Sequence, residues 1–228
     1  MKDHDGFTIY GSPASKIVFL QLVDGQEQAL PEQEAVLLSA LSGETGWCLA
    51  AVPVGDWNQD LTPWNAPPVF GKKSFGNSAS KTLNRLTAEV IPAIEADGPE
   101  ECRDYILCGY SLAGLFSLWA ACQTDMFSGI VAASPSVWYP DWMQYAGSHR
   151  FRTDHVYLSL GDREARTRNP VMARVADNLW ELYQLLSESG LSCMLDWNSG
   201  NHFADVDRRM AKGMAWMLKT MKEKRAEP

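Results

Sequence analysis

Short apolar runs alternate with amphipathic stretches along most of this 228-residue chain. Six runs have the length and composition of buried strands, at 16–23, 47–54, 105–109, 129–134, 155–160 and 193–197. Helical spacing of apolar positions follows at about 32–42, 79–96, 112–122, 170–189 and from 203 onward. The tryptophan-rich segment 55–78 and the aromatic segment after residue 134 are predicted as loops. Apolar strands alternating with helices predict an α/β fold, with a mostly parallel central sheet covered by helices on both faces.

The chain contains no Gly/Ser-rich or Pro-rich linker, so a single domain is predicted over residues 1–228. It has 28 acidic and 20 basic residues, a net charge of -8 and a pI near 5.0. Nucleic acids and anionic membranes bind basic patches, so neither is predicted as a partner. A small-molecule partner fits this composition better, and the sequence does not indicate an oligomeric state.

The cysteines do not form a recognisable ligand or disulfide pattern. All five lack CxxC or Cys/His spacing, at 48, 102, 108, 122 and 193. The sequence also has no phosphate loop or dinucleotide fingerprint, so neither a metal nor a cofactor is expected. The N-terminal stretch lacks the apolar core of a signal peptide, and no apolar run approaches the length of a membrane helix. These features predict a cytoplasmic protein.

The stretch "YILCGYSLAGLFSLWAA" contains the first candidate for chemistry. It places Ser111 two residues after Gly109, directly behind an apolar run and ahead of a helical pattern. A nucleophilic serine on a sharp strand-to-helix turn has this arrangement. A small residue in a tight connection would look the same, since Gly-x-Ser spacings arise by chance. Ligands of open parallel sheets bind at the carboxyl ends of strands, which is where Ser111 is expected to lie.

A serine hydroxyl becomes a useful nucleophile only beside an imidazole that is itself oriented by a carboxylate. Among the four histidines, His202 is the candidate base. Its loop, "WNSGNHFAD", follows the last predicted strand and precedes the last helix, so it belongs to the same sheet edge as Ser111. A loop histidine is usually only a polar surface residue. This one, however, follows the serine in the order Ser, acid, His of the α/β-hydrolases.

The acid is expected in the loop "GDREAR" after the strand at 155–160. Asp162 directly follows a glycine and suits a turn that bonds its own backbone. Glu164 lies farther into the loop, and its longer side chain can reach across to an imidazole. Glu164 is therefore favoured, with Asp162 as the alternative. Asp205 lies at the start of the last predicted helix, where a carboxylate is common because of the helix dipole.

These residues resemble the esterase branch of the α/β-hydrolases that includes esterase D, the mycolyltransferases and the trilactone siderophore (enterobactin) esterases. The resemblance is carried by "CGYSLAGLFSLWAACQTDMFSGIVAASPSVWY", "VYLSLGDRE" and "WNSGNHF". It covers residues 100–217 well and the first hundred loosely. It implies the α/β-hydrolase fold, with Ser111 as nucleophile, His202 as base and Glu164 as acid. One departure is Ala113, which stands where the G-x-S-x-G motif has glycine.

Acyl transfer also requires two backbone donors for the oxyanion. The N–H of Leu112, at the start of the helix after the serine, is the expected first donor. The second is expected from the loop after the strand at 47–54, around Asp56 and Trp57. Aromatic residues in nearby loops are candidates for the wall of a substrate pocket or, equally, for caps on the core: Trp57, Trp64, Trp138, Tyr139 and Trp142.

The combined pattern predicts a serine hydrolase that cleaves small to medium carboxylic esters, including aryl esters, through a Ser-His-Glu triad and an acyl-enzyme. A thioesterase or acyltransferase would use the same triad, since the acceptor depends on access of water to the site. A binding protein that kept the hydrolase fold without catalysis is the third possibility. Relic sites usually lose a triad member, and this sequence offers all three.

Overall fold

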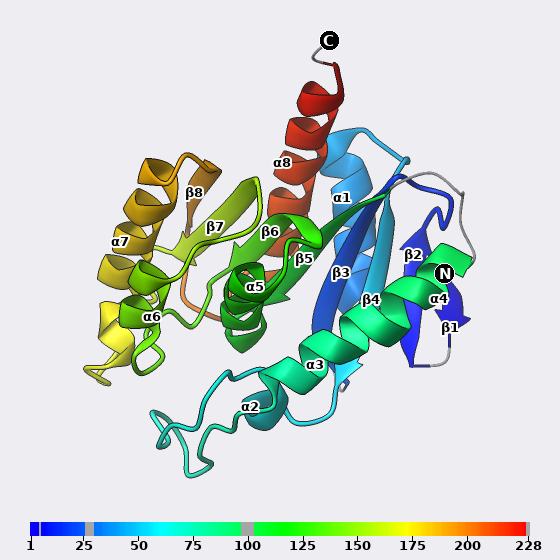
Figure 1. Cartoon of the computed structure of the whole chain (residues 1–228). Helices are drawn as coiled ribbons and strands as arrows, with labels where there is room; N and C mark the ends of the chain where they lie inside the picture. Colours follow the sequence, from blue (N-terminus) through cyan, green and yellow to red (C-terminus); the bar gives the residue numbers. More distant parts are fainter. Residues whose placement is uncertain (5, 26–29, 97–102, 227–228) are drawn as a thin grey trace.

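The computed structural model describes residues 1–4, 6–25, 30–96 and 103–226. Within them, one eight-stranded sheet has the order β1-β2-β4-β3-β5-β6-β7-β8 (Figure 1). The strands are β1 (Lys2–His4), β2 (Phe7–Gly11), β3 (Ile17–Asp24), β4 (Cys48–Val54), β5 (Asp104–Tyr110), β6 (Phe127–Ala133), β7 (His155–Gly161) and β8 (Ser192–Asn198). The β1–β2 and β2–β4 pairs are antiparallel, and the pairs from β4 to β8 are parallel. The predicted α/β fold with a mostly parallel sheet is confirmed.

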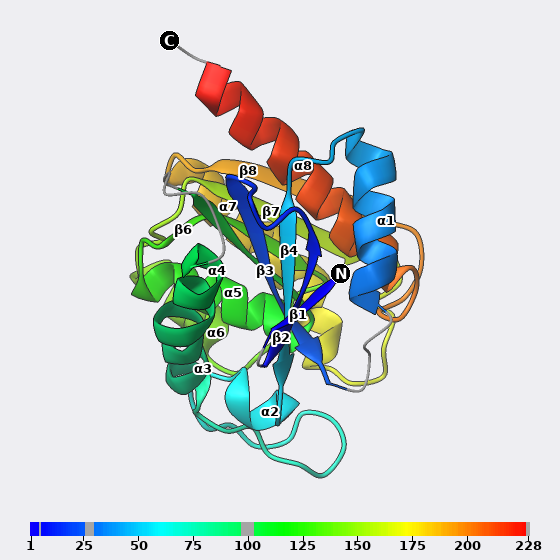
Figure 2. The same cartoon turned by 90° about the vertical axis from the view of Figure 1, so that its right-hand side faces the viewer.

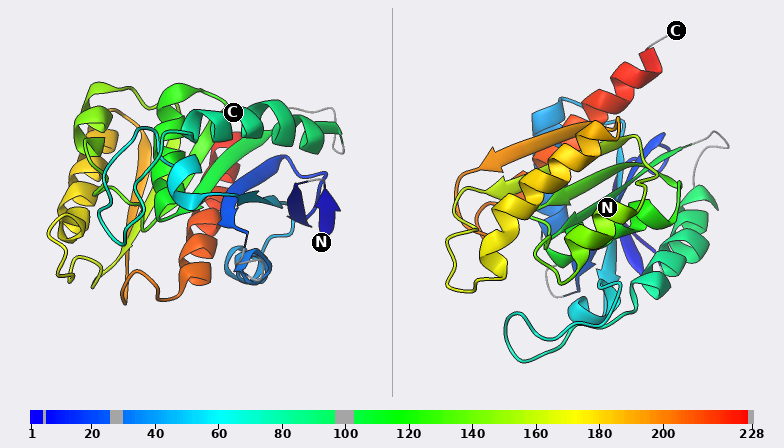
Figure 3. Two further views of the ribbon diagram at one scale, coloured as in Figure 1. Left: turned by 90° about the horizontal axis from the view of Figure 1, so that it is seen from below. Right: turned by 60° about the vertical axis from the view of Figure 1, so that its left-hand side comes forward.

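Helices cover both faces of this sheet. One layer consists of α1 (Leu30–Ser42) and α8 (Val206–Ala226), which lie side by side (Figure 2). The opposite layer contains α3 (Ala79–Arg85), α4 (Ile91–Ala96), α5 (Leu112–Gln123), α6 (Trp142–Ser148) and α7 (Val175–Glu188). Seen from below, the sheet lies between these two layers (Figure 3, left).

The central strands explain why both layers form. Along β3, Val18, Leu20 and Leu22 are buried in the core that includes α3, α4, α5 and α7, whereas Ile17 and Phe19 are buried against α1 and α8. A strand that is apolar on both faces removes both of its surfaces from water only when each face is covered by helices. The parallel strands then end at one common edge, from which the loops after β5, β7 and β8 leave.

The structure adds elements that the sequence pattern missed. The N-terminal hairpin of β1 and β2 was not predicted, and neither were α6 nor the one-turn α2 (Trp57–Asp60), both in segments expected to be loops. The predicted helix at 79–96 is present, but its middle turn, Leu86–Val90, is π-helical. A 3-10 turn at Met172–Arg174 precedes α7.

The described residues include no helix that is both long and apolar enough to cross a membrane. They also contain no cluster of three or more His, Cys, Asp or Glu side chains arranged to hold a metal ion. The described cysteines are free thiols, with Cys48, Cys108 and Cys122 buried and Cys193 half-buried. Cys102 lies outside the described residues.

Candidate active site

Ser111 lies on the sharp turn between β5 and α5. Its backbone has φ 58° and ψ -120°, a region that costs energy for any residue with a Cβ. The turn is held by two hydrogen bonds, from Ser111 N to Ala133 O and from Ser136 N to Ser111 O. Gly109 makes it sterically possible, because a Cβ there would lie 2.2 Å from the carbonyl carbon of Ala113. The methyl group of Ala113 is itself accommodated, fully buried in the core.

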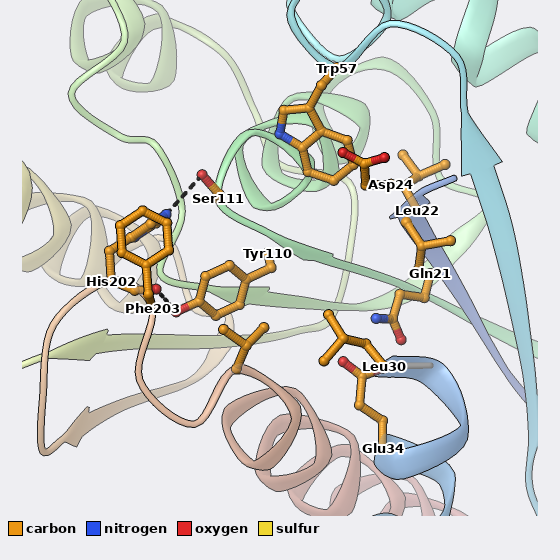
Figure 4. A pocket seen from close by; sticks show the side chains of 12 residues that line it. Gln21, Leu22, Asp24, Leu30, Glu34, Trp57, Tyr110, Ser111, His202 and Phe203 are labelled. Carbon is orange, nitrogen blue, oxygen red and sulfur yellow. Dashed lines mark hydrogen bonds between the residues drawn. The ribbon is translucent and has the colours of Figure 1, made fainter. Parts of the chain in front are cut away.

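His202 lies in the loop between β8 and α8, half-buried and beside Ser111. Its Nε2 is 3.1 Å from Ser111 Oγ, and its Nδ1 is 2.7 Å from Glu164 Oε2 (Figure 4 shows the Ser111 contact). An ionised carboxylate only accepts hydrogen bonds, so Nδ1 carries the hydrogen of a neutral ring. Nε2 is then the acceptor for the hydroxyl hydrogen of Ser111. The structure therefore joins these three side chains in one hydrogen-bonded chain.

Glu164 is held in place from both sides of its carboxylate. Oε1 accepts hydrogen bonds from Gly161 N at 2.7 Å, Ser134 Oγ at 2.7 Å and a guanidinium nitrogen of Arg209 at 2.8 Å, while Oε2 faces His202. The side chain is 3% exposed. Burial alone would raise the pKa of this carboxyl. The hydrogen bond from His202, the attraction of its ring when that ring is protonated, and the Ser134 and Gly161 donors outweigh burial and lower the pKa below its usual value.

The other carboxylates considered for the acid role lie elsewhere. Asp162 Oδ1 accepts a hydrogen bond from Gly200 N at 2.8 Å, and its side chain is largely exposed. It therefore ties the loop after β7 to the loop that carries His202. Asp205 is exposed at the beginning of α8.

Arg209 was not singled out by the sequence analysis, yet it connects the loops of the site. Its side chain is 1% exposed. Besides Glu164, its guanidinium donates to Tyr110 Oη at 3.0 Å and to the carbonyl oxygens of Ser199 and Asn201 at 3.2 and 3.0 Å. Tyr110 Oη in turn donates to His202 O at 2.7 Å. One buried cation thus contacts Glu164, Tyr110 directly before Ser111, and the loop that carries His202.

A cavity of about 210 Å³ opens beside Ser111 and His202 (Figure 4). Twelve of the described residues line it. They come from five places: the end of β3, the first turns of α1, the short helix α2, the turn between β5 and α5 that carries Ser111 (the elbow), and the loop that enters α8. Trp57 and Phe203 stand near the serine, and Leu22, Leu30 and Val206 add apolar surface. Gln21 and Glu34 form a polar patch away from the serine.

The aromatic residues expected in the pocket wall behave in two ways. Among the described residues that line the cavity, Trp57 is the only member of that set. Trp138, Tyr139 and Trp142 are buried in the core, and Trp64 packs against Tyr139 with its indole N–H donating to Pro140 O at 3.0 Å. Of the two readings left open for these four residues, caps on the core fit the structure, and their assignment to the wall of this pocket does not.

Two backbone segments next to Ser111 are relevant to oxyanion binding. Leu112 N begins α5 directly after the serine, as expected. The N–H of Asp56 is committed to the Asp60 carboxylate at 2.9 Å, so in the loop after β4 the candidate donor is Trp57. In α/β-hydrolases the second donor comes from the connection between the third strand and the following helix. Here that connection begins at Gly25, and its residues 26–29 lie outside the described residues.

The strand order and the serine on a strained turn after β5 define an α/β-hydrolase fold. The chain belongs to the family described as "Putative esterase", whose model matches residues 6–188. This match includes Ser111 and Glu164 and ends before His202. The family expected from the sequence motifs is thereby confirmed.

Individual relatives are distant. The chain is 27% identical over 139 residues to "Uncharacterized protein YbbA" of Bacillus subtilis (strain 168), a match that spans 58% of this chain and 56% of that protein. Siderophore hydrolase EstA from Aspergillus nidulans is 20% identical, with a TM-score of 0.70 and 95% of each chain covered. An IroE-like serine hydrolase from Shewanella oneidensis is 19% identical, with a TM-score of 0.75 over 93% of this chain and 75% of that one. At this identity, the two solved structures establish the fold alone.

Proposed function

We propose that the protein is a serine hydrolase that cleaves carboxylic esters through Ser111, His202 and Glu164. The observation that carries the proposal is the continuous chain from Ser111 Oγ to His202 Nε2 at 3.1 Å and from His202 Nδ1 to Glu164 Oε2 at 2.7 Å. The first distance suits proton transfer from the hydroxyl to the imidazole, and the second suits the hydrogen bond by which a carboxylate orients that imidazole. Membership of an esterase family supports the same reaction.

In the proposed reaction, Ser111 Oγ attacks the ester carbonyl carbon while His202 Nε2 takes the hydroxyl proton. The tetrahedral intermediate collapses, and the alcohol leaves with the proton that His202 returns. Water then attacks the acyl-enzyme and gives a proton to the same nitrogen. Collapse of the second intermediate releases the carboxylic acid and restores the Ser111 hydroxyl. Glu164 stabilises the imidazolium that forms in each half of the reaction.

The oxyanion of each intermediate is proposed to bind the N–H of Leu112 and a second backbone N–H. The first lies at the N-terminus of α5, whose helix dipole favours negative charge. Trp57 remains the proposed second donor in the loop after β4. The connection after β3, beginning at Gly25, is the alternative that the fold suggests.

The proposal predicts that Ser111→Ala abolishes turnover. Removing the nucleophile of a comparable triad lowers kcat by about a millionfold. The matched control is Ser117→Ala, which removes a buried hydroxyl from the same helix, where it donates to Ala113 O. A fluorophosphonate probe, followed by peptide mapping, should label Ser111 in the parent and in the control. Labelling of another residue, or near-parental esterase activity of Ser111→Ala, would contradict the proposal.

Assays with the same purified protein test which group leaves, an alcohol or a thiol, and whether water or another molecule accepts the acyl group. We expect hydrolysis of short acyl and aryl esters. The panel also includes the matching thioesters and a trilactone siderophore, the ester type of the siderophore esterases that the sequence motifs resemble. Faster cleavage of a thioester than of its oxygen ester would make the protein a thioesterase. Transfer of the acyl group to an added alcohol in preference to water would make it an acyltransferase.

A further inference from the structure

We propose that the cavity beside Ser111 contains an ammonium-binding subsite formed by Gln21 and Glu34, so that the favoured esters carry a protonated amine on a short methylene chain. The inference deepens the proposed esterase function and rests on it for the reacting end of the substrate. The subsite itself rests on different residues, contributed by β3 and α1.

Gln21 is the first observation. It lies on β3, is 4% exposed and lines the cavity. Its side-chain oxygen is buried and accepts no hydrogen bond from the described part of the chain. Buried polar groups without a partner cost free energy, and protein interiors rarely keep them. A donor delivered by a ligand in the cavity would satisfy this oxygen.

Glu34 supplies the charge. It rises from α1 toward Gln21 and Leu30 in Figure 4, and it is 1% exposed. A carboxylate so far removed from water interacts strongly with a cation brought next to it, because the surroundings screen the charge poorly. Asp24 adds a second carboxylate at the Trp57 end of the same cavity. Lys and Arg are both absent from the twelve described residues that line the cavity.

The chemistry of these groups selects one kind of ligand. An amide oxygen and carboxylates are acceptors, and a primary ammonium presents three donors and no acceptor. Leu22, Leu30 and Val206 flank the cavity and suit the methylene groups that would join the ammonium to the ester. Among the described residues that line the cavity, the acidic side chains are Asp24 and Glu34 and none is Lys or Arg, so an anionic group is disfavoured. The described residues also lack a metal-binding cluster, so a divalent cation fits less well.

Paired esters test the subsite. The kcat/KM of methyl 6-aminohexanoate is compared with that of methyl heptanoate, in which a methyl group replaces the ammonium, and with methyl 6-hydroxyhexanoate, which has a neutral donor. Measurements at physiological ionic strength limit attraction by the overall net charge. We expect the ammonium ester to be favoured over each neutral ester by about tenfold or more.

Two variants and one control locate the effect. Glu34→Gln should lower the ratio of kcat/KM for the ammonium ester to kcat/KM for a neutral ester by about tenfold. Gln21→Leu should lower the same ratio several-fold. Glu32→Gln removes an equal charge from the exposed side of the same helix and should leave the ratio unchanged. The readout is the ratio, because a purely structural role for Glu34 would lower both activities equally.

A second measurement does not depend on which half of the ester enters the subsite. Pentylammonium should inhibit hydrolysis of a neutral ester competitively, and pentanol should inhibit it at least about tenfold more weakly. The subsite would be overturned if methyl 6-aminohexanoate were cleaved no better than methyl heptanoate, or no better than methyl 6-hydroxyhexanoate. It would also be overturned if Glu34→Gln lowered the activity on the ammonium ester and on the neutral esters equally. Failure to hydrolyse any ester would instead reject the proposed function, and pentylammonium binding measured by thermal shift would still judge the subsite.

Discussion

The two oxygens of Glu164 have different surroundings, and this difference explains why the glutamate suits the acid role. Oε2 faces the imidazole of His202, whereas Oε1 accepts three hydrogen bonds that fix the plane of the carboxylate. Asp162 is less suited to face the imidazole, since its Oδ1 already accepts a hydrogen bond from the backbone N–H of Gly200. Both acids lie in the same loop, and the longer side chain of Glu164 is the one that reaches the imidazole of His202.

This geometry predicts different effects for two conservative changes. Glu164→Gln should lower kcat by about 10⁴, the loss seen when the corresponding aspartate of a serine protease becomes an amide. Asp162→Asn should leave kcat within about tenfold and mainly reduce the free energy of unfolding, by about 1 kcal/mol for one hydrogen bond at a largely exposed site. Steady-state kinetics and urea unfolding of both variants check this. The reverse pattern would assign the acid role to Asp162.

Arg209 and Glu164 form a buried pair, and their coupling can be measured. Arg209→Met leaves the carboxylate buried without its cation, so the free energy of unfolding should fall by about 3–5 kcal/mol. The double variant with Glu164→Gln should lose less than the sum of the two single changes, because no uncompensated charge remains. Arg208→Met, at the exposed neighbouring position, is the control. Strict additivity in urea unfolding would show that the two side chains do not support each other.

At the scale of elements, the elbow depends on the close approach of β5 and α5. Gly109→Ala places a methyl group 2.2 Å from the Ala113 carbonyl carbon, and backbone atoms there cannot yield without moving the helix. We expect the free energy of unfolding to fall by about 3 kcal/mol, the upper range of overpacking costs, with loss of activity as Ser111 shifts.

Gly147→Ala is the matched control, because a Cβ at Gly147 in α6 would meet only Leu185 Cδ1 at 3.8 Å. That change should be neutral or stabilising by up to about 1 kcal/mol through helix propensity. Thermal unfolding and esterase assays compare the two variants. If Gly109→Ala kept the stability and activity of the parent protein, the turn that carries Ser111 would be shown to tolerate a wider separation of β5 and α5.

The elements that the sequence predicted are those whose pattern is long and strongly apolar. All six expected strands are present. Five of them are buried along most of their length, whereas β8 lies at the edge of the sheet, is only partly buried, and was predicted from its apolar residues. The hairpin of β1 and β2 escaped prediction because its strands are short and take their stability from pairing with each other and with β4. Helix α6 escaped because its aromatic side chains, such as Trp142, suggested a loop.

At the scale of the molecule, the topology made the triad candidates predictable. Parallel strands end at one edge, so Ser111, the acid loop and His202 could be placed together from their order alone. Arg209 left only a weak signal, an arginine in helical register with Gly213 and Met217 on the sheet-facing side of α8. Gln21 lies within the apolar run of β3, and Glu34 follows Glu32 and Gln33 in a polar stretch, so neither stood out in the sequence. The loop aromatics could not be assigned because their burial depends on how distant loops pack.

The dimensions of the whole site limit the size of the acyl group that the proposed reaction can use. The cavity of about 210 Å³ is smaller than the roughly 300 Å³ at which sites for drug-sized ligands begin. The described residues that line it include the end of β3, the first turns of α1 and the loop entering α8, so a long chain would extend beyond it into solvent. We therefore expect C2 to C4 aryl esters to be cleaved with a kcat/KM at least about a hundredfold above that of a C16 ester, because most of the long chain stays in water and gains nothing from burial.

p-Nitrophenyl butyrate and detergent-emulsified p-nitrophenyl palmitate provide the comparison. Phe203→Ala should change the ratio less than Trp57→Ala, because the Phe203 ring is largely exposed whereas Trp57 is half-buried in the lining of the cavity. Equal or faster cleavage of the palmitate would mean that the acyl chain binds outside this cavity.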